Sequence, residues 1–156
     1  MPPYRILFIC HGNIFRSAFA HHRLLALLRD NGDAKVAVRS AGTKARPGEP
    51  PPAIVTDGAR AYGLDLARHT SALATKELID WATHIYVMQE DMRDAVRDLS
   101  PDALGRTQLL GALDPDAADP QIPDVGGDGS PEASVAARFA RIDRLLRCLI
   151  AQELKF

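Results

Sequence analysis

One short stretch near the start of the chain constrains the fold most: a cysteine and an arginine six positions apart, Cys10 and Arg16, joined by a polar loop. The apolar run 4–9 before the cysteine is typical of a buried strand, and the apolar spacing over 19–28 is typical of a helix. A glycine and an asparagine in the loop tolerate unusual backbone angles. The pattern predicts a strand, a tight loop and a helix, whose N-terminus is a place where anions bind.

The bulk composition fits one domain over residues 1–156. Of the 156 residues, 46% are hydrophobic and 25% are charged, which is ordinary for a soluble globular protein. The net charge of -1 gives no general attraction to nucleic acid or anionic membranes. No apolar stretch is long enough to cross a bilayer, and the first residues lack the layout of a signal peptide.

Cysteine content bears on the compartment. The two cysteines are Cys10 and Cys148, and so few thiols lead us to expect a reduced, cytoplasmic protein. The count also permits one disulfide, which would consume the thiol of the loop.

Strand-like and helix-like segments alternate along the chain. The predicted strands are 4–9, 35–39, 83–88 and 107–110, and the predicted helices are 16–30, 52–61, 75–81, 90–99 and a last helix after Ser130. This alternation predicts an α/β fold with a parallel sheet between two layers of helices, a three-layer sandwich. Residues 114–131 are rich in Asp, Pro and Gly, and a loop this long is usually functional or disordered.

The loop residues suit nucleophilic attack on a phosphate ester. Loop amides at a helix N-terminus and a nearby guanidinium favour the thiolate of a cysteine, which is the attacking form. Arg16 offers a planar fork that matches two phosphoryl oxygens, and Ser17 can donate a hydrogen bond to the sulfur. The structural alternative is a buried Cys10 and a surface Arg16, because this spacing also occurs by chance.

Residues 6–17 resemble the N-terminal signature of the low-molecular-weight protein tyrosine phosphatases, an apolar strand followed by C-x-G-N-x-C-R-S. The S-A-G-T at 40–43 and the G-x-D-x-x-x-H stretch ending at His69 also match the family pattern. The resemblance runs from Arg5 to the last helix. It implies a four-stranded parallel sheet flanked by helices, a phosphate loop after the first strand, and hydrolysis of protein phosphotyrosine through a phosphocysteine.

The same resemblance implies roles for single residues, with Cys10 as nucleophile and Arg16 holding the phosphoryl group. The phosphate-binding loop would be His11, Gly12, Asn13, Ile14, Phe15, Arg16 and Ser17. The residues that support the loop would be Asn13, Ser17, Ser40 and His69, because an asparagine in a left-handed conformation needs partners. Without the resemblance, His69 reads as a surface histidine and Ser40 as a strand-end turn. We expect no metal and no cofactor, because the arginine and the amides stabilise the charge.

A general acid should protonate the leaving group, and the same carboxylate can then activate water. The family uses an aspartate in a late loop, in Asp-Pro followed by aromatic residues. Asp119 keeps the proline, whereas Asp124 is followed by Val125. Asp124 nevertheless follows Ile-Pro, precedes two glycines and lies nearer the usual distance from the last helix. We therefore expect Asp124 to be the acid, with Asp119 as the alternative.

The chain departs from the family pattern inside the loop. Phe15 replaces the second cysteine, so a reversible disulfide with Cys10 is not expected. Phe15 is expected to pack under the loop or to contact substrate. The aromatic pair after the acid is absent, which leaves the substrate open, although Ile14 favours phosphotyrosine by the same resemblance.

Other functions stay open. The first is a non-catalytic phosphate-binding regulatory module. The second is an arsenate reductase, which needs two further cysteines to relay oxidation, whereas no cysteine lies between Cys10 and Cys148. The third is a phosphatase for phosphoarginine or a small ester. The expected partner is a phosphotyrosine protein, with no nucleic acid and no membrane, and the expected assembly is a monomer or weak dimer.

Overall fold

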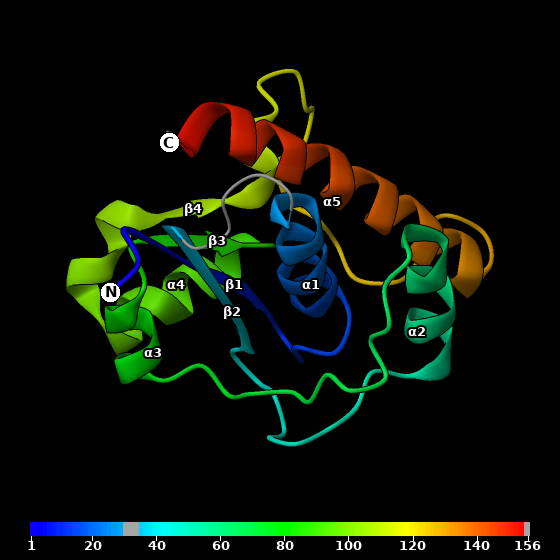
Figure 1. The fold of residues 1–156 in the computed structure, drawn as a ribbon, viewed down its shortest axis with the longest axis horizontal. Coiled ribbons are helices and arrows are strands. Elements are labelled where there is room, and N and C mark those ends of the chain that lie inside the picture. The colour runs from blue at the N-terminus through cyan, green and yellow to red at the C-terminus, as the bar shows by residue number, and fades with distance from the viewer. Residues whose placement is uncertain (30–34, 155–156) are drawn as a thin grey trace.

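The structure is a computed structural model that describes residues 1–29 and 35–154. Its centre is a sheet with the strand order β2-β1-β3-β4, in which every neighbouring pair is parallel (Figure 1). The strands are β1 (Tyr4–Cys10), β2 (Val36–Gly42), β3 (His84–Val87) and β4 (Thr107–Leu109). The predicted four-stranded parallel sheet is confirmed.

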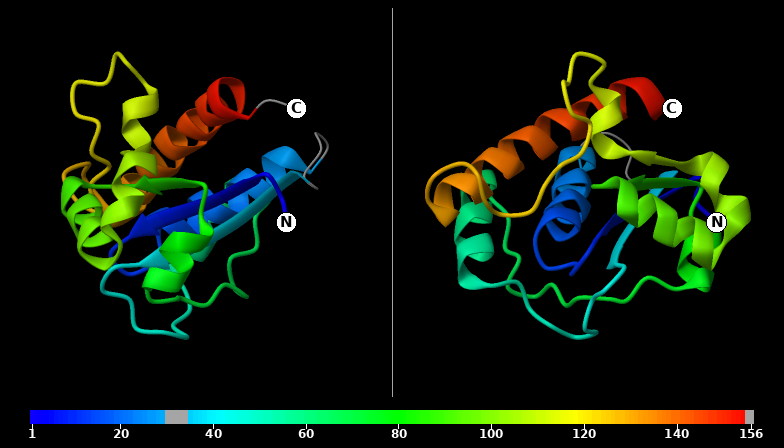
Figure 2. Two further views of the ribbon diagram at one scale, coloured as in Figure 1. Left: turned by 90° about the vertical axis from the view of Figure 1, so that its left-hand side faces the viewer. Right: turned by 180° about the vertical axis from the view of Figure 1, so that it is seen from behind.

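Helices cover both faces of the sheet, which confirms the three layers (Figure 2). One layer holds α1 and α5, with α2 packed against α5, and the other holds α3 and α4. The bounds are α1 (Arg16–Leu28), α2 (Ala53–Ala59), α3 (Lys76–Trp81), α4 (Glu90–Leu99) and α5 (Pro131–Glu153), with 3-10 helices η2 (Arg60–Tyr62), η3 (Pro101–Arg106) and η4 (Leu110–Leu113). None of the helices in the described part of the chain has the length and apolarity needed to span a membrane.

The strand order creates a binding position beside the end of β1. β2 lies on one side of β1 and β3 on the other, so the two connections run in opposite directions across the sheet. Because parallel crossovers are right-handed, α1 of the first connection and α3 of the second pack on opposite faces (Figure 1). A crevice therefore opens at the carboxyl ends of the strands where the direction reverses. Cys10, the last residue of β1, stands at this position.

The core explains why β1 reads as a continuous apolar run. Residues 6–9 have no exposed surface, because the central strand is covered on both faces. On α5, apolar residues that alternate at spacings of four and three form a buried stripe: Val135, Phe139, Ile142, Leu146 and Leu149.

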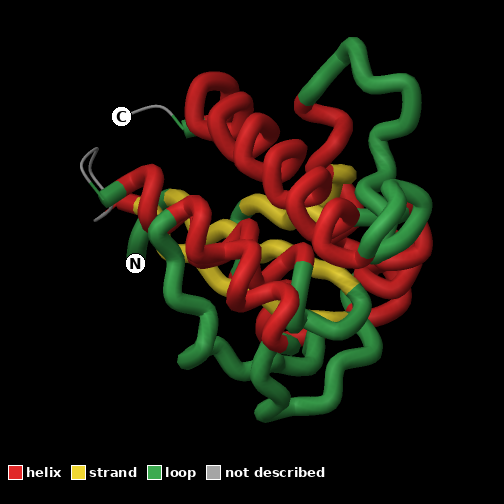
Figure 3. The backbone as a smooth tube through the Cα atoms, turned by 90° about the vertical axis from the view of Figure 1, so that its right-hand side faces the viewer, coloured by secondary structure: helices red, strands yellow, loops and turns green. Residues whose placement is uncertain are grey.

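Element boundaries differ slightly from the predictions. The predicted helix 52–61 is α2 followed by the tighter η2, and the predicted strand 35–39 extends to Gly42. The predicted helix 16–30 is α1, and residue 30 lies outside the described residues. Residues 114–130 form the expected long irregular connection, drawn as loop in Figure 3.

Candidate active site

The loop between β1 and α1 folds around the sulfur of Cys10. The backbone N–H of Asn13 donates to Sγ at 3.2 Å, and the hydroxyl of Ser17 lies 2.9 Å from the same sulfur. The Asn13 side-chain amide donates to Ser17 Oγ at 2.8 Å, so the hydroxyl proton is left for the sulfur or for the Ala41 carbonyl, which is more distant at 3.5 Å. Donors directed at a sulfur stabilise its thiolate form.

Asn13 sets the shape of this loop. Its φ of +57° makes it the only non-glycine residue with positive φ among the described residues, a conformation that costs roughly 1–2 kcal/mol and that asparagine tolerates better than most residues. Its buried side chain also accepts from Ala72 N at 2.9 Å, and its carbonyl lies 2.8 Å from His69 Nε2. These bonds fix the strained residue in place.

The structure directs Ser40 away from the loop. Three of the four residues predicted to support the loop meet there, but the hydroxyl of Ser40 lies 2.8 Å from Nδ1 of His21 on α1. The alternation along β2 turns this side chain toward α1. Its link to the loop is indirect, because His21 stacks on His22, which hydrogen-bonds His69. Ser40 thus reaches the phosphate loop only through the three histidines, and its support of the loop stays a prediction.

Gly42 lets β2 approach the loop closely. The next two amides, Thr43 N and Lys44 N, donate at 2.9 Å to the carbonyls of Cys10 and His11. A Cβ at Gly42 would lie only 2.3 Å from the His11 carbonyl oxygen. The glycine of the S-A-G-T stretch is thus required by this contact.

Arg16 is buried, with 2% of its surface exposed. Its Nη1 donates to Gln89 Oε1 at 2.6 Å and to the Ile122 carbonyl at 2.8 Å, which fixes the guanidinium. Its Nε is buried without a hydrogen-bond partner, which costs about 1–3 kcal/mol. A phosphoryl oxygen would supply the acceptor. No local pattern points to Gln89, since 73 positions separate it from Arg16.

The N-terminus of α1 is open to an anion. Phe15 occupies the N-cap position and makes no capping hydrogen bond through its side chain, so the first helical amides have no side-chain acceptor. The Phe15 ring is 6% exposed and packs 5.6 Å from the ring of Phe139. Of its two expected positions, the ring takes the packed one, while its edge still contributes to the pocket wall.

A pocket of about 350 Å³ lies over the loop. It is lined by Cys10, His11, Gly12, Ile14, Phe15, Arg16, Lys44, Pro52, Ile54, Val55, Asp124 and Val125. The thiol and the guanidinium meet at this pocket, and much of the remaining wall is apolar. A ligand with an anionic group at the thiol and the guanidinium, and an apolar group against the remaining wall, would fit this pocket.

The two candidate acids lie in different places. Asp124 lines the pocket, and its Oδ2 is 3.9 Å from Nη2 of Arg16. Asp119 is not among the lining residues, and its Oδ1 accepts from Gln121 N at 2.9 Å within the loop itself. The geometry thus places Asp124 in the pocket that Cys10 also lines and leaves Asp119 outside it.

Arg138 of α5 holds the segment that carries Asp124. Its Nε donates to the Pro123 carbonyl at 2.8 Å, and its Nη2 donates to the carbonyls of Asp124 and Gly126 at 3.0 and 2.9 Å. Its Nη1 pairs with Asp128 at 2.7 Å. Sequence reasoning missed this residue, although Arg138 lies within the apolar stripe of α5, where an arginine is unexpected.

A second pair at the rim of the pocket also went unpredicted. Nε2 of His11 lies 2.5 Å from Oδ2 of Asp91, at the start of α4. Burial acts to raise the pKa of Asp91, but the hydrogen bond from His11 and its charge outweigh this and lower the pKa. Asp91 therefore remains an anion, and the pair ties the loop to α4.

Similarity to known proteins covers almost the whole chain. Residues 5–155 match the family described as low molecular weight phosphotyrosine protein phosphatase. A protein-arginine-phosphatase of Geobacillus stearothermophilus is 37% identical over 122 residues, which cover 76% of this chain and 79% of that protein. A putative low molecular weight protein-tyrosine-phosphatase of Klebsiella pneumoniae is 31% identical over 106 residues, or 68% and 70% of the two chains. The solved structure of the YwlE arginine phosphatase from Geobacillus stearothermophilus has a TM-score of 0.81 at 28% identity and covers 99% of both chains.

Proposed function

The chain belongs to the low molecular weight phosphotyrosine protein phosphatase family, and we propose that it hydrolyses phosphotyrosine in proteins through a phosphocysteine on Cys10. The observation that carries this site assignment is the buried Nε of Arg16, which lacks an acceptor in the same pocket as the Cys10 thiol. An oxygen of a phosphoryl group would accept from this Nε, and its phosphorus would be attacked by the Cys10 thiolate.

The first step transfers the phosphoryl group to sulfur. The Cys10 thiolate attacks phosphorus, the S–P bond forms, and the bond from phosphorus to the phenolic oxygen breaks. Arg16 and the loop amides stabilise the charge on the equatorial oxygens. Asp124 gives its proton to the departing phenolate, whose conjugate acid has a pKa of about 10.

The second step releases inorganic phosphate. Asp124, now a carboxylate, removes a proton from a water molecule, and the resulting oxygen nucleophile attacks phosphorus. The S–P bond breaks and the thiolate of Cys10 re-forms. The hydrogen bond from Ser17 stabilises the leaving sulfur.

Substitutions of the nucleophile and the two aspartates test these roles. We expect Cys10→Ser to abolish hydrolysis of phenyl phosphate and Asp124→Asn to lower kcat by roughly 10²-fold or more. Asp119→Asn is the matched control and should retain activity, since Asp119 lies outside the pocket. The measurement is steady-state phosphate release. Loss of activity in Asp119→Asn with an active Asp124→Asn would reverse the acid assignment, and an inactive wild-type protein would refute catalysis.

The choice between tyrosine and arginine substrates rests on the pocket wall. The first relative described above is a protein-arginine-phosphatase, so phosphoarginine is the second candidate. Ile14, Ile54 and Val55 line the wall and suit a flat apolar ring. Only Asp124, among the lining residues, offers a carboxylate to a cationic guanidinium.

Paired peptides decide between the two substrates. We expect a higher kcat/KM for a phosphotyrosine peptide than for a phosphoarginine peptide of the same sequence, measured by phosphate release. Ile14→Thr should shift the ratio toward phosphoarginine, because a hydroxyl replaces part of the apolar wall. A preference for phosphoarginine in the wild-type protein would overturn the tyrosine assignment while leaving the phosphatase chemistry intact.

The remaining expectations stay part of the proposal. Cys10 and Cys148 are free thiols, as a thiolate nucleophile requires, which supports a reduced, cytoplasmic setting. One domain over residues 1–156 remains our expectation. We expect a monomer or weak dimer, which sedimentation equilibrium would measure. With these two cysteines alone, thiol relay to arsenate is not favoured.

A further inference from the structure

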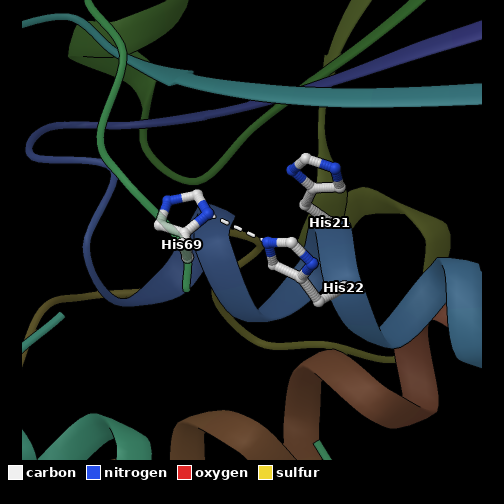
Figure 4. Close-up of side chains that lie close together, drawn as sticks. All are labelled: His21, His22 and His69. Carbon is white, nitrogen blue, oxygen red and sulfur yellow. Dashed lines mark hydrogen bonds between the residues drawn. The ribbon is translucent and has the colours of Figure 1, made fainter. Parts of the chain in front are cut away.

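Three histidines meet beside the phosphate loop and outside its pocket. His21 and His22 are neighbours on α1, and His69 comes from the segment between η2 and α3, so that the three rings face a common space (Figure 4). One ring nitrogen from each lies within 4.8 Å of the others. None of the three lines the pocket that holds Cys10. The reaction steps proposed above therefore involve none of the three rings, although His69 supports the phosphate loop through its hydrogen bond to Asn13.

We propose that His21, His22 and His69 bind one divalent transition-metal ion of the Zn²⁺ class. Imidazole nitrogens suit Zn²⁺, Cu²⁺ and Ni²⁺, and three histidines with one open position form a known type of zinc coordination. Nε2 of His22 and Nδ1 of His69 are 2.9 Å apart. Two ligands of a tetrahedral Zn²⁺ at about 2.0–2.1 Å from the ion would be separated by roughly 3.3 Å, so small ring movements suffice for this pair.

The hydrogen bond of His69 prepares it as a ligand. Its Nε2 faces the carbonyl oxygen of Asn13 at 2.8 Å, and a carbonyl only accepts, so Nε2 carries the proton. The lone pair of the neutral ring is then on Nδ1, which points to His22. Metal-binding histidines usually donate their second N–H to such an acceptor, which fixes the ring.

Burial keeps the three imidazoles neutral, which is the form that binds a metal ion. Burial first, and the neighbouring histidines second, lower the pKa of His21 to about 3 and that of His22 to about 4. Burial also lowers the pKa of His69 against the opposing effect of its hydrogen bond to Asn13. Neutral imidazoles expose their lone pairs and do not repel a metal ion. The hydroxyl of Ser40 holds the His21 ring and, as donor or acceptor, is compatible with either tautomer.

The site is coupled to catalysis through one hydrogen bond. A metal on Nδ1 of His69 holds the ring with Nε2–H directed at Asn13, the residue with positive φ that shapes the phosphate loop. Metal binding thus stabilises the loop without entering the pocket. Catalysis as proposed above needs no metal, and the site adds a structural ion beside it.

Metal titration of an inactive variant tests the site. The Cys10→Ser protein is used, so that the nucleophile cannot bind the metal itself. We expect one equivalent of Co²⁺ to give the visible absorption bands of a tetrahedral complex, Zn²⁺ to displace it, and Zn²⁺ to raise the thermal midpoint. Adding His22→Gln should weaken binding by more than about tenfold, whereas His84→Gln, which removes a histidine outside the cluster, should leave it unchanged.

The opposite results reject the proposal. Unaltered Co²⁺ bands in the His22→Gln variant would place the ion elsewhere, and absence of binding to the Cys10→Ser protein would exclude a site on these three residues. Circular dichroism and inorganic phosphate binding confirm that each variant is folded, so that a lost metal site is not mistaken for an unfolded chain. Because no arm measures turnover, failure here leaves the phosphatase assignment unaffected.

Discussion

At several positions of this site, the backbone conformation determines which residue type fits. Asn13 adopts positive φ and turns its amide toward Cys10 Sγ, and Gly42 brings β2 against the carbonyl of His11. Phe15 takes a position that the resemblance assigns to a thiol and packs against Phe139 instead. Backbone contacts, the side-chain hydrogen bonds of Asn13 and His69, and the packing of Phe15 together hold the loop.

At the residue scale, Gly42→Ala should disable the loop. The new Cβ would meet the His11 carbonyl oxygen at 2.3 Å and Asn13 N at 2.9 Å, so the loop must move by close to 1 Å. A displacement of that size can cost about 10²-fold in kcat/KM. The measurement is aryl phosphate hydrolysis together with inorganic phosphate binding.

Gly105→Ala is the control for this substitution. A Cβ at Gly105 meets no atom within 4 Å, and its φ lies outside the left-handed region. Activity should be unchanged there. Equal activity of Gly42→Ala and Gly105→Ala would show that the close contact does not shape the loop.

At the element scale, α5 supports the acid as well as the core. Its apolar stripe is buried and the helix packs against α1 and α2. Arg138 from the same buried face binds three carbonyls of the loop that carries Asp124. Ser130 caps the helix by accepting from Ala133 N at 3.1 Å, as predicted from the Ser-Pro start. The position of the helix therefore sets the position of the loop.

Arg138→Lys should slow catalysis selectively. Lysine keeps the charge facing Asp128 but cannot bind the carbonyls of Pro123, Asp124 and Gly126 together. We expect kcat to fall about tenfold for aryl phosphates with poor leaving groups, which depend on the acid, and less for good leaving groups. Arg144→Lys, on the exposed side of α5, should have no effect. An equal loss for both kinds of leaving group would indicate a general loss of structure instead of a misplaced acid.

At the scale of the whole molecule, the sheet brings the site together from distant parts of the chain. The thiol ends β1, Gln89 precedes α4, and the Ile122 carbonyl and Asp124 come from the long connection before α5. Arg16 donates hydrogen bonds both to Gln89, just before α4, and to the Ile122 carbonyl in the long connection. We therefore expect folding to be linked to anion binding, because only the assembled site places the unpaired Nε of Arg16 beside the pocket.

Inorganic phosphate should therefore stabilise the fold. At a concentration 100 times its Kd, a ligand that binds only the native state raises the free energy of unfolding by about 2.7 kcal/mol. Arg16→Lys should lose most of this gain, because lysine has no fork of donors, whereas Arg144→Lys should keep it. Urea unfolding at fixed phosphate measures the difference. Full stabilisation in Arg16→Lys would mean that phosphate binds elsewhere.

Much of the fold followed from local patterns, and the exceptions have physical causes. The predicted helix 90–99 agrees with α4 residue for residue, because its start and stop signals lie within the element. The bond between Ser40 and His21 was missed, because the direction of a side chain depends on which helix covers β2. The pairing of His11 with Asp91 spans 80 positions, which no local spacing encodes.

The strand-loop-helix around Cys10 and Arg16 was determined by the sequence itself, because backbone angles and apolar spacing are properties of neighbouring residues. The tertiary structure decided that Asp124 lines the pocket and Asp119 does not, that His21 clusters with His22 and His69, and that Nε of Arg16 has no partner. Each of these depends on distances between side chains of different elements. Only the packed sheet and helices set those distances.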